Sequence, residues 1–132
     1  MNIDALATAW APRLLSVLRI MAGLLFLQHG TAKHFKIPVM PMFAKLEVMT
    51  LPGIAGVIEI VGGLLLIVGL FTRTTAFVLS GMMAVAYFIA HAPAGFYPIL
   101  NGGELAALYC FVFLYIAAAG PGPWSYDAMR KK

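Results

Sequence analysis

The chain has 132 residues, of which 62% are hydrophobic and only 11% are charged. A soluble domain is about 45–50% apolar and about 25% charged, so the composition excludes an ordinary soluble domain and predicts an integral membrane protein. The net charge of +4 does not indicate nucleic-acid binding, because the basic residues are scattered or terminal and form no stripe with interleaved aromatic side chains.

Four apolar segments predict an all-α fold, an integral membrane four-helix bundle with short loops. The whole chain, residues 1–132, is then a single four-span transmembrane domain. The predicted spans are about residues 13–31, 51–71, 75–91 and 103–119. Their lengths are close to the roughly 20 apolar residues that cross a bilayer as a helix.

The segment before the first span lacks the pattern of a secretory signal peptide. Its early charge is Asp4, and a basic region ahead of the apolar stretch is missing. We therefore expect the first apolar segment to stay in the membrane. In the long connection after it, Pro38 and Pro41 prevent one continuous helix, and a short interfacial helix is predicted near residues 42–49.

Local signals mark the ends of the later spans. Pro52 suits the first turn of the second span, where the missing N–H costs nothing. Thr72 or Thr74 is the expected N-cap of the third span. The prolines and glycines after residue 119 end the fourth span, and Cys110, the only cysteine, is expected to be a buried, unreactive thiol within it.

The distribution of Lys and Arg predicts the orientation of the spans. One side of the membrane holds five basic residues, and the other side holds three. The first set is Arg13, Arg73, Arg130, Lys131 and Lys132, and the second is Lys33, Lys36 and Lys45. The excess places both termini in the cytoplasm, with Trp10 and Trp124 at the inner interface.

Glu59 lies within the second predicted span. A carboxylate there costs about 2.5–3.5 kcal/mol on insertion scales, so we expect it to face the interior of the bundle and to find a partner. Gly56, Gly62 and Gly63 lie one turn away and allow another helix to approach the same face. Both observations indicate a site around the acid.

Each predicted span places one ionisable residue toward the outer end of the bundle: His29, Glu59, His91 and Glu104. We expect these side chains to converge in one cavity open to the outer face, where they bind a ligand or handle protons. Secondary candidates at the same end are Lys33, Tyr97 and Asn101. Asn101 and Glu104 also suit the start of the fourth span, as its N-cap and as a first-turn acid.

Arg19 lies deeper than these residues, on a helix face that continues through Gly23, Gly30 and Lys33. We expect Arg19 to approach Glu59 from below. Three roles are open for it. It pairs with Glu59 and fixes helix register, it handles protons or binds an anionic or quinone-like ligand, or it reaches the inner headgroups.

For His29 and His91, interfacial hydrogen bonding, hydrogen bonding to a cofactor or substrate, and metal binding are all open. No pair of ligands stands at metal-binding spacing on one helix, so no residue is assigned to a metal, and none is assigned as catalytic. Several aromatic side chains either pack and anchor the helices or line a flat pocket. They are Tyr87, Phe88, Phe96, Tyr97, Tyr109 and Tyr115.

Several of these segments together resemble the DoxX-like family of small four-helix bacterial membrane proteins. They are residues 19–33, residues 56–73, His91 with Gly95 and Phe96, residues 101–104, and residues 120–122. The resemblance covers most of the chain, from about Arg13 to Asp127. It implies a multi-pass protein of the bacterial plasma (inner) membrane.

Some members of that family are parts of membrane-linked oxidoreductase systems, so the resemblance implies a redox-associated subunit that binds a quinone or a similar small amphipathic ligand within the bundle. The implied partners are the lipid bilayer, a redox partner subunit and further copies of the chain. The sequence has no flavin, haem or iron–sulfur motif, so a redox role needs a diffusible quinone or a partner. The alternatives are a non-catalytic assembly factor or scaffold and, last, a small transporter without an evident inverted repeat.

Overall fold

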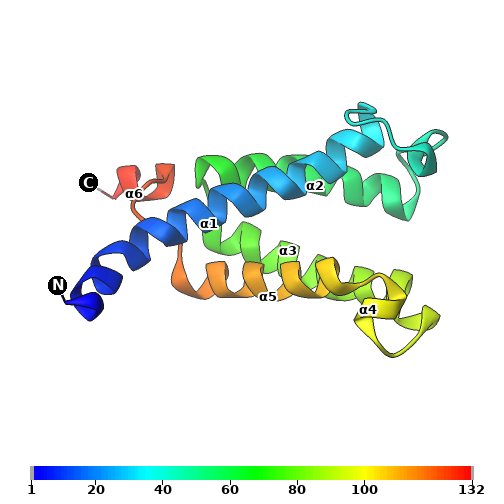
Figure 1. The fold of residues 1–132 in the computed structure, drawn as a ribbon. Coiled ribbons are helices and arrows are strands. Elements are labelled where there is room, and N and C mark those ends of the chain that lie inside the picture. The colour runs from blue at the N-terminus through cyan, green and yellow to red at the C-terminus, as the bar shows by residue number, and fades with distance from the viewer. Residues whose placement is uncertain (1, 132) are drawn as a thin grey trace.

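The computed structural model describes residues 2–131, and four long helices account for most of them (Figure 1). The long helices are α1 (Ile3–His34), α2 (Leu51–Val68), α3 (Thr72–Ala86) and α5 (Glu104–Ala119). Short helices fill the connections: η1 (Pro41–Phe43), the π-helix η2 (Tyr87–His91), η3 (Ala92–Ala94), α4 (Pro98–Asn101) and α6 (Tyr126–Arg130). No strand occurs within residues 2–131, which confirms the all-α prediction.

Three helical segments are long and apolar enough to cross a membrane. They are α1, α2 and the continuous segment Thr72–Ala94. Helix α5 is apolar, but its 16 residues rise only about 24 Å at 1.5 Å per residue, less than the roughly 30 Å of a hydrocarbon core. The structure therefore confirms three helices of spanning length, and the fourth span stays a prediction.

Several helix ends differ from the sequence prediction. Helix α1 begins ten residues earlier, where the Asn2 side chain accepts a hydrogen bond from the Ala5 N–H (3.2 Å), and it ends only after Lys33. No threonine caps α3; its N-cap position is Phe71, without a side-chain cap. Asn101 ends α4 and is not the N-cap of α5, because Gly103 takes that position.

Helices α1 and α2 pack antiparallel through glycines. A Cβ atom built on Gly30 would lie 2.6 Å from the Gly56 carbonyl oxygen, and one built on Gly23 would lie 2.9 Å from the Gly63 carbonyl oxygen. Gly56, Glu59, Gly62 and Gly63 are all buried, which confirms the prediction that this face of α2 lies inside the bundle. The two backbones approach closely because glycine has no side chain to hold them apart.

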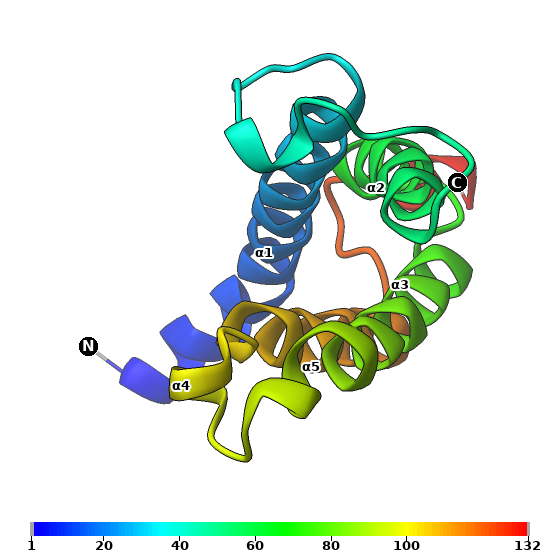
Figure 2. The ribbon, with the colours of Figure 1, turned by 90° about the vertical axis from the view of Figure 1, so that its right-hand side faces the viewer.

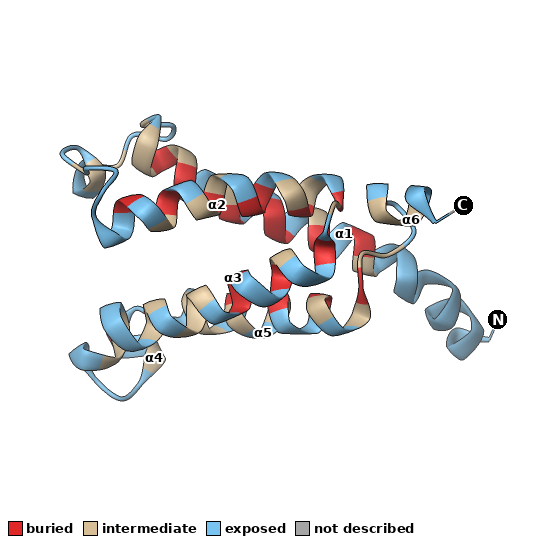
Figure 3. Ribbon diagram, turned by 180° about the vertical axis from the view of Figure 1, so that it is seen from behind, coloured by how far each residue is buried: buried red, intermediate tan, exposed pale blue. Residues whose placement is uncertain are grey.

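The four long helices form two pairs, α1 with α2 and α3 with α5, arranged in that order around a common axis (Figure 2). The pairs meet at one end and diverge toward the other (Figures 1 and 3). We call the first the closed end; it holds the α2–α3 turn and residues 120–131. The open end holds residues 35–50 and 87–103.

The hydrophobic core lies on the side of the closed end. In α3 the buried residues fall between Thr72 and Ser80, and in α5 they fall between Tyr109 and Ile116. Phe26 lies within this core. Its ring is edge-on to the rings of Tyr109 and Phe113, with ring centres 5.4 Å and 5.1 Å apart. The outer halves of α3 and α5 therefore contribute little to the packing between the pairs (Figure 3).

Candidate functional site

Arg19 is completely buried and ties three stretches of backbone together near the closed end. Its Nε donates to the Leu66 carbonyl of α2 (2.8 Å), and its terminal nitrogens donate to the carbonyls of Pro121 and Trp124 (2.7 Å for Trp124). Ser16 holds the same segment by accepting from the Trp124 N–H (3.1 Å). The planar guanidinium fork suits this task, because it presents five donors in fixed directions.

The predicted pairing of Arg19 with Glu59 is wrong, and the helix register explains why. Because Gly23 faces Gly63 and Gly30 faces Gly56, Glu59 is level with about residue 27 of α1, roughly 12 Å from Arg19 along the helix. Side chains also lean toward the N-terminus of their own helix. Arg19 therefore leans toward the closed end, and Glu59 leans away from it.

Glu59 forms an ion pair with Lys33, near the open end of α1. The side chains are 5% and 12% exposed, respectively, so the pair is largely removed from solvent. The Lys33 ammonium also lies 5.6 Å from the centre of the Phe43 ring, which comes from η1. Two buried opposite charges satisfy each other here, as expected for ionisable residues at membrane depth.

His34 and Lys36 hold the surroundings of the ion pair in place. The His34 ring lies 2.7 Å from the Gly53 carbonyl oxygen, which joins the end of α1 to the start of α2. Lys36 donates to the carbonyls of Lys33 and Phe43, so the loop after α1 folds back over the helix end. The long connection is thus anchored beside the ion pair.

His29 and Tyr109 lie across the gap between the helix pairs. Their ring centres are 6.2 Å apart, with the planes nearly perpendicular. Tyr109 is 6% exposed, so its ring is buried. Within residues 2–131, the buried side-chain nitrogen and oxygen atoms that lack a hydrogen bond do not include those of His29 or Tyr109.

His91 belongs to a second polar group, on the α3–α5 pair. Its Nδ1 lies 3.2 Å from the Asn101 carbonyl oxygen, while the Asn101 amide donates to the Tyr87 hydroxyl (3.1 Å) and the Gly95 carbonyl (2.9 Å). This network fixes the connection between η2 and α5. Asn101 is thus buried and hydrogen-bonded to three parts of this connection, whereas the sequence predicted it as a helix cap.

The predicted outer residues therefore come together only in part. His29 contacts Tyr109, and Glu59 pairs with Lys33 at a similar depth of the bundle. Glu104 and Tyr97 are exposed. Among the described residues, no hydrogen bond or ion pair joins His91 or Glu104 to Glu59, and no three His, Cys, Asp or Glu side chains are placed to hold a metal ion.

Asp127, at the closed end, makes a helix-capping contact that was not predicted from the sequence. Its carboxylate accepts from the N–H groups of Phe71 (3.0 Å) and Thr72 (2.9 Å), so α6 caps α3 from a distance of more than fifty residues in sequence. Partial burial raises the pKa of Asp127, but the hydrogen bonds from Thr72 and Phe71 and the charge of Arg130 together lower it below its ordinary value. No local signal predicts such a long-range cap.

These features define a helical membrane protein with two tightly packed helix pairs and a buried ion pair between its first two long helices. The DoxX family model matches residues 14–92, and the chain belongs to the DoxX family. A protein of Haemophilus influenzae described as uncharacterized is 47% identical over 124 residues, which cover 89% of this chain and 91% of that protein. A second such protein from the same organism is 34% identical over 74 residues, 56% of this chain and 49% of its own. No solved structure matches.

Proposed function

We propose that the protein is a redox-associated subunit of the bacterial inner membrane that binds a quinone, or a similar small amphipathic molecule, between its helix pairs toward the open end. In this proposal the chain is a single four-span domain, with the closed end and both termini in the cytoplasm. Trp10 and Trp124 and the excess of basic residues on the closed side support that orientation.

The observation that carries the proposal is the polar group formed by Lys33, Glu59, His29 and Tyr109. It combines a largely buried ion pair with two polar rings, His29 and Tyr109, that contact each other across the helix pairs. Glu59 is level with about residue 27 of α1, so the ion pair and this ring contact lie at similar depth. Ionisable residues within a membrane bundle commonly mark ligand or proton sites, and a bound molecule with oxygen atoms facing His29 and Tyr109 would give this group such a role.

The residues present fit the chemistry of a quinone. Its carbonyl oxygens are acceptors, and the Tyr109 hydroxyl, the His29 ring and the Lys33 ammonium are donors. The flat ring matches the aromatic surface of Tyr109, which stacks on Phe113 with ring centres 5.3 Å apart and an interplanar angle of 10°. A bound quinone accepts electrons and protons from a partner, and the Glu59 carboxylate is the group of this chain placed to hold a proton.

Binding of a short-chain quinone to the purified, detergent-solubilised protein tests this proposal. Tyr109→Phe removes one hydroxyl from the site, and we expect it to weaken binding by roughly tenfold, the value of a hydrogen bond to a buried polar partner. Tyr115→Phe is the matched control, since Tyr115 lies on the same helix and is 61% exposed. Equal affinities for the two variants, or no binding by the wild type and no redox partner on pull-down, would refute the proposal.

The network around Arg19 favours a second candidate, a non-catalytic assembly factor or scaffold. Its guanidinium donates only to backbone carbonyls, so its role is to fix helix register. If the Lys33–Glu59 pair has the same kind of role, Glu59→Gln affects folding alone. A folded Glu59→Gln protein with unaltered cellular function and no ligand would establish the scaffold, whereas loss of function with the fold retained supports the ligand site.

A further inference from the structure

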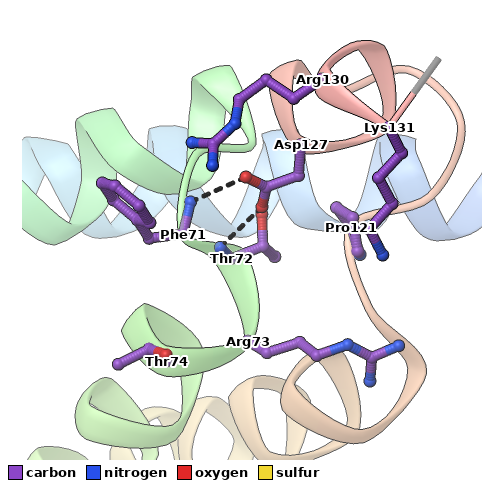
Figure 4. A pocket seen from close by; sticks show the side chains of 8 residues that line it. All are labelled: Phe71, Thr72, Arg73, Thr74, Pro121, Asp127, Arg130 and Lys131. Atoms are coloured by element: carbon purple, nitrogen blue, oxygen red, sulfur yellow. Dashed lines mark hydrogen bonds between the residues drawn. The ribbon is translucent and has the colours of Figure 1, made fainter.

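A basic pocket opens at the closed end (Figure 4). It has a volume of about 270 Å³ and lies between the start of α3 and the C-terminal helix α6. Arg73, Arg130 and Lys131 line it together with one carboxylate, that of Asp127, so the lining carries three positive charges and one negative charge. Its net charge of +2 favours an anion.

The contacts of these side chains leave donors free for a ligand. Both oxygens of Asp127 are directed at the N–H groups of Phe71 and Thr72 (Figure 4). The Arg130 guanidinium lies over the Phe71 ring at 5.6 Å and makes no hydrogen bond to a described residue. Arg73 uses one terminal nitrogen to bind carbonyls at the end of α5, which holds its guanidinium in a fixed position beside the pocket.

Thr72 is an independent indication of a ligand. This residue lines the pocket and is 1% exposed; its hydroxyl lies beside the Asp127 carboxylate but makes no hydrogen bond of normal geometry to it or to another described residue. It also lies at the N-terminus of α3, where the helix dipole favours negative charge. An oxygen atom of an anion in the pocket would accept from this hydroxyl.

An apolar groove adjoins the pocket and runs along the membrane-facing side of α2 and α3. It has a volume of about 340 Å³, and its lining includes Val57, Val61, Leu65 and Val78. Thr74 lines both the groove and the basic pocket, so the two are adjacent. A polar, cationic pocket beside an apolar groove matches a molecule with an anionic head and a hydrocarbon chain.

We propose that the protein binds an anionic phospholipid at this place. The phosphate group lies among Arg73, Arg130 and Lys131, and one acyl chain lies along the groove between α2 and α3. The closed end, with its tryptophans, lies at the level of the lipid headgroups, and basic pockets between membrane helices at that level are suited to anionic headgroups. This site is independent of the ligand proposed near Glu59.

Retention of phospholipid by the full chain in native mass spectrometry tests the proposal. We expect the wild type to retain phosphatidylglycerol in preference to phosphatidylcholine. Arg130→Gln should reduce that preference about fivefold, the value of one cation near an anionic lipid. Arg13→Gln is the control, because it removes the same charge near the same end of the molecule. Arg13 lies outside the pocket, with its guanidinium over the Trp10 ring.

The outcomes distinguish a specific lipid site from nonspecific electrostatic attraction between basic residues and anionic lipids. A preference reduced by Arg130→Gln and not by Arg13→Gln supports the site, and Lys131→Gln repeats the test if circular dichroism shows that Arg130→Gln disturbs the fold. Equal losses in the Arg130 and Arg13 variants, or no preference in the wild type, would overturn it. Displacement of the lipid by inorganic phosphate alone would also overturn it, because the pocket would then serve a soluble anion.

Discussion

Close packing of α1 on α2 predicts that alanine at Gly30 destabilises the protein. The new Cβ would lie 2.6 Å from the Gly56 carbonyl oxygen, and ordinary contacts begin near 3.4 Å, so the backbones must separate locally by about 0.8 Å. Overpacking of this kind costs about 1–3 kcal/mol. The separation also moves Lys33, which is on the same helix face, away from Glu59.

Gly81→Ala is the matched control, because nothing lies within 4 Å of a Cβ at that position of α3. Alanine is favoured over glycine within a helix by about 0.5–1 kcal/mol, so this variant should gain stability. The difference between the two variants then isolates the steric cost of about 1–3 kcal/mol. Unfolding in mixed micelles of increasing SDS content, followed by circular dichroism, measures it. A Gly30→Ala protein as stable as Gly81→Ala would refute the close contact.

Three further predictions concern the Lys33–Glu59 ion pair, the Asp127 cap and the backbone contacts of Arg19. Lys33→Met alone should lower the free energy of unfolding by about 3–5 kcal/mol, because it leaves the Glu59 carboxylate buried without a partner. Lys33→Met combined with Glu59→Met should be close to neutral. The same micelle unfolding assay compares the two variants. Asp127→Ala should cost about 0.5–2 kcal/mol as the loss of a helix cap. Since the pKa of Asp127 is lowered in the folded state, its stabilisation is present above the ordinary pKa of 3.8 and is lost as pH falls through the folded value, so wild type and variant should converge in acid; a constant difference down to pH 2 would contradict this. Arg19→Lys should release residues 120–131, because one ammonium cannot hold three separate carbonyls, and faster trypsin cleavage near Arg130 would report it.

The sequence was sufficient to predict the burial of Glu59 and its glycines, because a charge in an apolar helix and small residues at helical spacing both point to a helix contact. It was not sufficient to choose the partner. Arg19 and Lys33 lie on one face of α1, and only the register between Gly23–Gly63 and Gly30–Gly56 shows which of them reaches Glu59. The N-terminal lean of side chains, which is a general property of helices, was the signal that favoured Lys33.

Long-range backbone contacts were beyond prediction. Arg19 binds carbonyls at Pro121 and Trp124, and Asp127 caps α3, because the C-terminal segment folds back across the closed end. Backbone acceptors carry no sequence signature, so neither contact has a pattern to read. The length of α1 was also missed, since its first turns are exposed and polar in part and their helical state depends on the Asn2 cap.

The central claim is that the polar group of Lys33, Glu59, His29 and Tyr109 binds a ligand. Its most direct test is the affinity of a short-chain quinone for the wild type and for the double variant Lys33→Met with Glu59→Met, which removes both charges and leaves unbranched apolar side chains of similar length. The account predicts that the wild type binds and that the double variant, still folded in the unfolding assay, loses at least about tenfold in affinity. Equal affinities in the two proteins would contradict it.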